Sequence, residues 1–134
     1  MTMEEVKVIN SVLNELKGLK DFGETKPLGL SAIFDKGSHM WNRDGNYNLM
    51  FLRTQERHCN DILQYRGHIF LNEVFEILGL PKTKLGQIVG WYYNENSPKE
   101  NVPVIFEVFE GTDDEGDYSA TITFHVQGEI LSKI

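Results

Sequence analysis

The residues that could carry chemistry in this chain of 134 residues include a run of acids, four histidines and a single cysteine. The run Asp113-Asp114-Glu115-Gly116-Asp117 offers the carboxylate oxygens that a calcium ion prefers. An EF-hand loop, however, needs a glycine after its third ligand and a glutamate six residues beyond that glycine. Tyr118 follows Asp117 instead, and Phe124 stands at the distance of the required glutamate. The sequence therefore predicts a solvated hairpin loop rather than a calcium site.

The histidines, at positions 39, 58, 68 and 125, show none of the spacings that bring two ligands to one metal ion. His58 and Cys59 are adjacent, but adjacent side chains on a helix diverge by about 100°. The chain also lacks a glycine-rich loop of the phosphate-binding type. We therefore expect neither a metal nor a cofactor.

Cys59 lies on the apolar side of an expected helix, whereas a nucleophilic cysteine needs a lowered pKa and a neighbouring base. A buried, unreactive thiol is predicted. Glu107 and Glu110 could serve hydrolysis only in a cleft, and the sequence places them in none. One enzyme hypothesis stays open, a hydrolase-like site assembled from scattered residues. Its members would be His39, His68, Glu73 and Asn72.

The net charge of −7 is concentrated near the C-terminus, because residues 100–132 contain eight acids and no lysine or arginine. Such a region repels phosphates and attracts cationic groups within the ~8 Å that physiological salt leaves unscreened. A nucleic-acid ligand is therefore not expected. We predict a protein partner with a basic surface. The candidate binding residues are Asp113, Asp114, Glu115 and Asp117.

Apolar residues recur at helical spacing in three segments, 3–20, 48–66 and 68–79. Asn46 is a candidate N-cap for the second helix, and Gly79-Leu80-Pro81 ends the third because proline cannot continue a helix. The N-terminal helix, within residues 1–22, would pack on the core or remain peripheral and bind a partner.

The last third of the chain changes to a period of two residues. Strands are expected near 87–94, 102–110 and 117–127, and one short extended piece near 28–34. Helices followed by antiparallel strands predict a single α+β domain over residues 1–134, with the helices on one face of a small antiparallel sheet of about three strands. The acidic N-terminus and the lack of a long apolar run favour a cytoplasmic protein without a membrane partner.

Gly37-Ser38-His39-Met40 matches the residues that protease cleavage leaves behind in common expression vectors. No histidine run precedes these residues, so we interpret them as native. If they were a fusion joint, the residues before Met40 would be foreign.

A compact block of motifs occupies residues 66–91. A helix opening with Phe70-Leu71-Asn72-Glu73-Val74 leads through a Gly-Pro stop into a strand ending in Val89-Gly90-Trp91. This block resembles small uncharacterised proteins of prophages and integrative elements in Gram-positive bacteria. The resemblance implies a mobile-element setting, and no catalytic residues follow from it. The matching positions are Arg66, Gly67, Phe70, Leu71, Asn72, Glu73, Val74, Leu78, Gly79, Pro81, Thr83, Gly86, Val89, Gly90 and Trp91.

Most of these positions have a structural explanation, and Asn72 is expected to hydrogen-bond the turn around Thr83, with a ligand role as the alternative. The function favoured by the sequence is a non-enzymatic interaction or accessory module of a mobile element. The small enzyme described above is the alternative, and a homo-oligomer is compatible with both.

Overall fold

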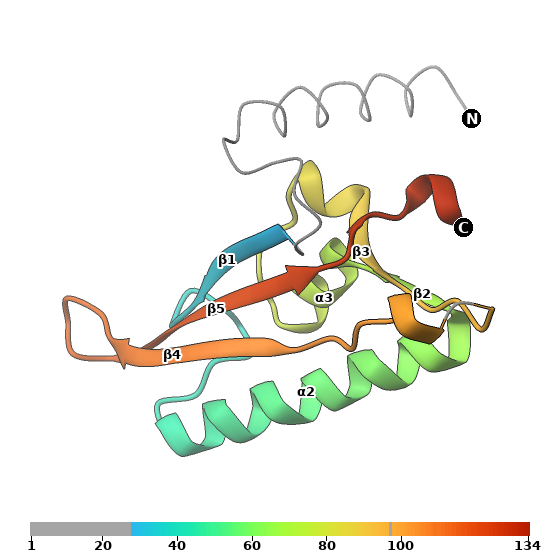
Figure 1. Cartoon of the computed structure of the whole chain (residues 1–134). Coiled ribbons are helices and arrows are strands. Elements are labelled where there is room, and N and C mark those ends of the chain that lie inside the picture. Colours follow the sequence, from blue (N-terminus) through green and yellow to red (C-terminus); the bar gives the residue numbers. More distant parts are fainter. Residues whose placement is uncertain (1–27, 97) are drawn as a thin grey trace.

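The computed structural model describes residues 28–96 and 98–134, so the expected N-terminal helix at 3–20 lies outside the described residues. In the described part, the α-helices α2 (Gly45–Arg66) and α3 (Leu71–Ile77) accompany two three-stranded antiparallel sheets. The α+β class is therefore confirmed. Figure 1 shows α2 running alongside β4, with α3 behind the sheet.

The first sheet has the order β1-β5-β4 and consists of β1 (Leu28–Phe34), β5 (Tyr118–Val126) and β4 (Phe106–Thr112). Its register places Phe124 of β5 between Leu30 and Phe106. The second sheet has the order β2-β3-β6 and consists of β2 (His68–Phe70), β3 (Val89–Tyr92) and β6 (Gly128–Glu129). Since β6 follows β5 after a single residue, one stretch of chain serves both sheets.

The three strands predicted in the C-terminal third are present as β3, β4 and β5, but β3 belongs to the second sheet. The short strands β2 and β6 were not predicted, because they carry little sequence signal. The extended piece at 28–34 is a full strand, paired along its length with β5. The predicted helix at 68–79 begins only at Leu71, because residues 68–70 form β2. Ile69 is fully buried opposite Trp91, so its burial arises from strand pairing and not from a helical stripe.

The ends of both helices follow local rules. Asp44, rather than the predicted Asn46, caps α2 by accepting a hydrogen bond from the backbone N–H of Asn46 at 2.9 Å. At the end of α3, Gly79 adopts φ +70°, and the N–H of Leu80 donates to the carbonyl of Phe75 at 2.8 Å. This is the left-handed glycine stop expected from the Gly-Leu-Pro sequence.

The core lies between the helices and one face of the first sheet. Phe124 makes edge-to-face contacts with Phe75 of α3 and Phe106 of β4. Trp91 is fully buried and fastens the second sheet to the same core. The indole N–H of Trp91 has no hydrogen-bond partner among the described residues.

Strand β5 shows which face of the first sheet is covered. Its even-numbered residues from Ala120 to Val126 are buried, whereas Thr121 is exposed and Thr123 and His125 are half-buried. The helices therefore cover one face, and we call the opposite face the outer face. Within residues 28–96 and 98–134, no helix has the length and apolar character needed to cross a membrane.

Candidate functional site

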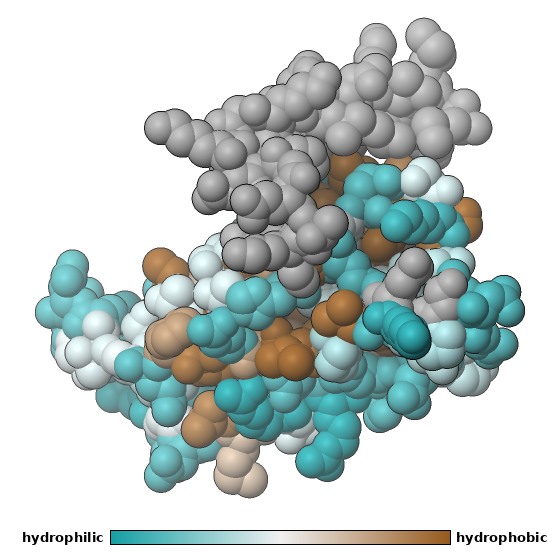
Figure 2. Space-filling view, viewed as in Figure 1, coloured by the Kyte–Doolittle hydropathy of each residue, from teal (hydrophilic) through white to brown (hydrophobic). Residues whose placement is uncertain are grey.

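The outer face carries a row of exposed residues across its three strands, with hydrophobic side chains on the two edge strands and a threonine on the central strand. The register aligns Ile33, Thr121 and Phe109. Ile33 is 59% exposed and Phe109 is 56% exposed. Ile105, which directly precedes β4, is 50% exposed and lies on the same side by strand alternation. In Figure 2, hydrophobic residues (brown) lie among hydrophilic ones (teal) on the visible face of the molecule.

An entirely polar row runs beside this one and consists of Ser31, Thr123 and Glu107. The hydroxyls of Ser31 and Thr123 are 3.1 Å apart, and Glu107 Oε2 lies 2.6 Å from His125 Nε2. A carboxylate that orients an imidazole is part of many catalytic sites. Here both side chains are nearly half exposed on a strand face, where an ion pair contributes at most about 1 kcal/mol.

Glu107 and Glu110 do not form a catalytic pair, because they point to opposite faces of β4 and each has a partner on β5. Glu107 contacts His125, and Glu110 accepts a hydrogen bond from the Tyr118 hydroxyl at 2.9 Å. Burial and this hydrogen bond raise the pKa of Tyr118. The Glu107–His125 contact was missed by sequence reasoning, although period-two alternation across a β4–β5 hairpin would place both residues on one face.

The acidic run forms the turn between β4 and β5, as predicted, and we call residues 113–117 the acidic hairpin. Asp113 Oδ1 accepts hydrogen bonds from the backbone N–H groups of Glu115 at 2.9 Å and Asp117 at 3.0 Å. These bonds, the Asp117 N–H first, and the nearby Lys36 lower the pKa of Asp113. Asp113 therefore has a structural role in the turn besides its charge.

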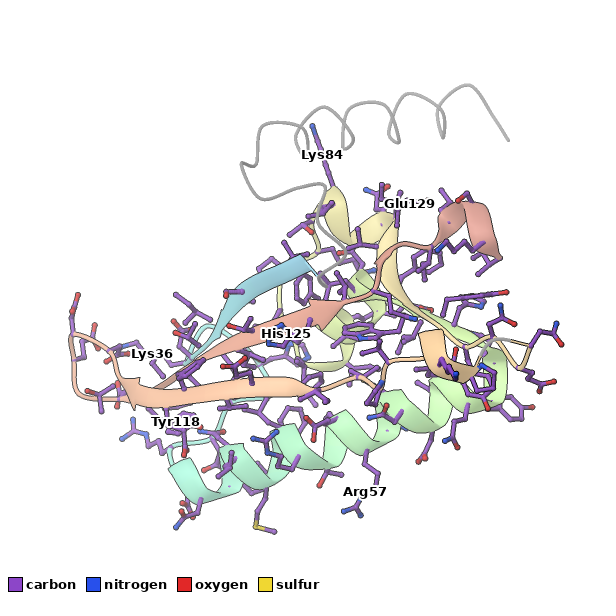
Figure 3. All side chains as sticks on the ribbon, in the orientation of Figure 1. Lys36, Arg57, Lys84, Tyr118, His125 and Glu129 are labelled. Carbon is purple, nitrogen blue, oxygen red and sulfur yellow. The ribbon has the colours of Figure 1, made fainter. Side chains whose placement is uncertain are left out.

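Lys36 corrects the expectation that these acids lack a compensating base. Its Nζ donates to a carboxylate oxygen of Glu115 and lies 3.3 Å from Asp117 Oδ2 and 3.5 Å from Asp113 Oδ2. Figure 3 shows Lys36 beside the hairpin. The hydrogen bond to Glu115, together with the neighbouring carboxylates, raises the pKa of Lys36. Sequence reasoning missed this contact because about 80 residues separate the partners.

The hairpin remains acidic in spite of Lys36. One ammonium group faces three carboxylates, and Asp114, which is exposed, adds a fourth to the same turn. The ammonium also occupies the point on which the carboxylates converge. Among the described residues, no group of three or more His, Cys, Asp or Glu side chains could hold a metal ion.

The structure does not bring the scattered enzyme candidates together. His68 and Glu73 flank Arg66 at the start of α3, where Arg66 Nη2 lies 2.5 Å from Glu73 Oε2 and its Nε donates to the His68 carbonyl at 3.1 Å. Burial and the charge of Arg66 lower the pKa of His68. His39 lies at the opposite end of α3 beside Gly79, about 10 Å away by the rise of the helix.

Asn72 has the structural role expected from the sequence. Its Nδ2 donates to the Thr83 carbonyl at 2.8 Å, and its Oδ1 accepts from the Thr83 N–H at 2.9 Å. Thr83 Oγ1 in turn accepts from the Gly86 N–H at 3.0 Å. Both polar atoms of the Asn72 side chain, Nδ2 and Oδ1, are therefore hydrogen-bonded to the turn.

Cys59 is fully buried in the core, as predicted. Burial, with smaller contributions from Glu56 and Glu73, raises the pKa of its thiol to about 12. A thiol with this pKa carries almost no thiolate at neutral pH, so it has neither the charge nor the access that a nucleophile needs.

Comparison with known proteins identifies a family but no activity. The model of a family of unknown function, DUF6353, matches residues 4–134, and the chain therefore belongs to that family. No curated protein and no solved structure matches the chain. The matched range includes residues on both sides of Gly37-Ser38-His39-Met40, which supports their interpretation as native.

Proposed function

We propose that this member of a family of unknown function is a non-enzymatic interaction module. Its partner is a protein with a hydrophobic and basic surface, which docks on the outer face beside the acidic hairpin. The resemblance of residues 66–91 supports a role as an accessory protein of a prophage or other mobile element, acting in the cytoplasm.

The observation that carries the proposal is the placement of two kinds of surface on the same strands. Ile33 and Phe109 are more than half exposed across the outer face, and β4 and β5 continue directly into the acidic hairpin. Exposed hydrophobic groups contribute affinity when a partner covers them, whereas charges mainly accelerate and orient the approach. A basic partner would find both contributions at one end of the sheet.

The enzyme alternative has less support. Its four candidate residues divide between the two ends of α3, and Asn72 is committed to Thr83. The Glu107–His125 pair lies on an exposed strand face, where water competes for every polar contact.

Affinity capture from a lysate of the source organism tests the proposal. Wild type, Phe109→Ser and a matched control, Tyr65→Ser, would be immobilised at equal density and the captured proteins compared by quantitative mass spectrometry. Tyr65 is 95% exposed on α2, so its substitution removes an aromatic surface group away from the outer face. We expect at least one protein to be captured by wild type and Tyr65→Ser and to be reduced about tenfold with Phe109→Ser.

The acidic hairpin is tested with Asp114→Asn/Glu115→Gln. This variant should mainly slow association with the same protein and make its capture less sensitive to added salt. Identical sets of captured proteins for wild type, Phe109→Ser and the hairpin variant would contradict the proposal.

A further inference from the structure

Strand β1 forms one edge of the first sheet, and its outer side has no paired strand within the part of the chain that the structure describes (Figure 1). The direction in which the N–H and C=O groups of β1 point can be derived from the hydrogen bonds of β4 at the other edge of the sheet. Phe106 of β4 turns its N–H and C=O away from β5, because they bind Glu56 Oε2 at 2.6 Å and Arg53 Nη1 at 2.8 Å on α2.

In an antiparallel ladder, the backbone N–H and C=O groups of two directly opposed residues either hydrogen-bond each other or both point away from the partner strand. These two arrangements alternate along the strand. Phe124 is opposite Phe106, so the backbone N–H and C=O of Phe124 point toward β1, where they pair with the backbone of Leu30. The backbone N–H and C=O groups of the residues next to Leu30 in β1 therefore point away from β5. The free edge thus presents the N–H and C=O groups of Gly29, Ser31 and Ile33.

The two edges of this sheet differ in their protection. The β4 side is closed at Val104 and Phe106 by side chains of α2 and carries Glu107 and Glu110. In contrast, β1 reads LGLSAIF and has no charge and no proline. Proteins commonly block free edges with charges, prolines or covering elements, and an edge without charges or prolines accepts another strand more readily.

We propose that a second copy of this chain pairs with β1, antiparallel and about a two-fold axis at Ser31. This arrangement opposes Ser31 to Ser31 of the second copy and Gly29 to Ile33 of the second copy. Each opposed pair can exchange two backbone hydrogen bonds, because all these residues turn outward.

The side chains suit this arrangement. Ile33 is 59% exposed on the outer face, and the glycine opposite it leaves room for its side chain. On the covered side, Leu30 opposes the smaller Ala32 of the second copy. A two-fold interface needs such self-complementarity, because each surface patch meets its own copy.

The charges of the described residues do not oppose the pairing. Each acidic hairpin lies beyond Phe34, at the end of β1 that Lys36 follows. The two-fold axis places the two copies of Phe34 about 20 Å apart along the strands. This separation exceeds the ~8 Å over which charges act at physiological salt. The joined sheet would have six strands, with both outer faces still accessible.

Light scattering on the full chain, from low to high micromolar concentration, tests the proposal. Wild type should approach twice the monomer mass of 15.4 kDa as its concentration rises. Ser31→Lys and Ser31→Glu each place like charges face to face at the axis, and each should raise the dimer dissociation constant about tenfold or more. An equimolar mixture of the two variants should recover the dimer, because lysine then faces glutamate.

Recovery in the mixture shows that both variants fold, so loss of the dimer cannot be assigned to unfolding. Phe109→Ser, two strands away, is the matched control and should remain dimeric. A wild type that stays monomeric throughout, or a dimer that Ser31→Lys leaves unchanged, would overturn the proposal. The result is independent of the proposed function, which is read from captured partners.

Discussion

Replacing Asn60 by alanine tests the connection between α2 and the first sheet. Asn60 Nδ2 donates to the Val104 carbonyl at 2.8 Å and to the Glu56 carbonyl at 3.0 Å, and its Oδ1 accepts from the Val104 N–H at 2.8 Å. Val104 is 1% exposed, so water reaches these groups only after local rearrangement. In Asn60→Ala, the backbone N–H and C=O of Val104 would both lose their hydrogen-bond partners.

The expected loss follows from these contacts. A buried polar group left without a partner costs about 1–3 kcal/mol, and local relaxation should admit some water to the two groups of Val104. Alanine is the better helix former, which returns about 0.5 kcal/mol. We therefore expect a net loss of about 2–3 kcal/mol. With an unfolding entropy of about 0.28 kcal/mol per kelvin for a chain of this size, the Tm should fall by about 7–11 °C.

Thermal and urea unfolding would measure the loss, and hydrogen exchange at the Val104 amide would localise it. Asn46→Ala is the control, because Asn46 is an exposed residue in the first turn of the same helix. It should change stability by less than about 0.5 kcal/mol. The reasoning is refuted if Asn60→Ala matches this control and the Val104 amide remains equally protected.

Three further predictions concern single residues. Native Cys59 should react with a thiol probe at pH 7–9 only as fast as the protein unfolds, since its pKa is about 12, and rapid labelling would contradict its burial. Gly86→Ala should cost about 1–3 kcal/mol, because its Cβ would stand 2.1 Å from Asn72 Oδ1. The losses of Gly86→Ala and Asn72→Ala should not add, and additive losses in urea unfolding would contradict this contact. Asp113→Ala should lower the Tm more than Asp113→Asn, which keeps an acceptor for the two N–H groups of the turn. Because folding lowers the pKa of Asp113, the stabilisation by its carboxylate is present above about pH 4 and should disappear as pH falls through the folded pKa. An equal Tm difference between wild type and Asp113→Ala at pH 2.5 and pH 7 would contradict this pH dependence.

The parts of the fold that the sequence predicted well are those encoded by neighbouring residues. The apolar stripe of α2, the glycine stop at Gly79 and the alternation of β5 need only a local window to be recognised. The bonds between Asn72 and Thr83 could also be anticipated, because a helix followed by a tight turn brings these residues close. Local periodicity failed at residues 68–70, where three residues are too few to show a period.

Contacts between distant segments could not be predicted. Lys36 meets the acidic hairpin only because β1 pairs with β5, and nothing in either segment specifies that pairing. The asparagines show the same limit, with the bonds between Asn72 and Thr83 as the exception. Four of them bind both the N–H and the C=O of a single residue, and the sequence separation ranges from 6 to 44 residues. The pairs are Asn48 with Asn42, Asn60 with Val104, Asn72 with Thr83 and Asn101 with Asn94.

These long-range contacts also decide where a partner can bind. The second sheet offers little surface at its centre, because Val89, Gly90 and Trp91 are buried and a Cβ on Gly90 would stand 2.1 Å from the Ile69 carbonyl oxygen. On the first sheet, α2 closes part of the β4 edge through Asn60, and the core takes one face. Among residues 28–96 and 98–134, nothing covers the remaining face and the β1 edge. A partner protein on the outer face and a second copy on β1 would share only Ile33, whereas Phe109 and the acidic hairpin belong to the first proposal and the backbone of the β1 edge to the second, so the two proposals can be tested separately on one molecule.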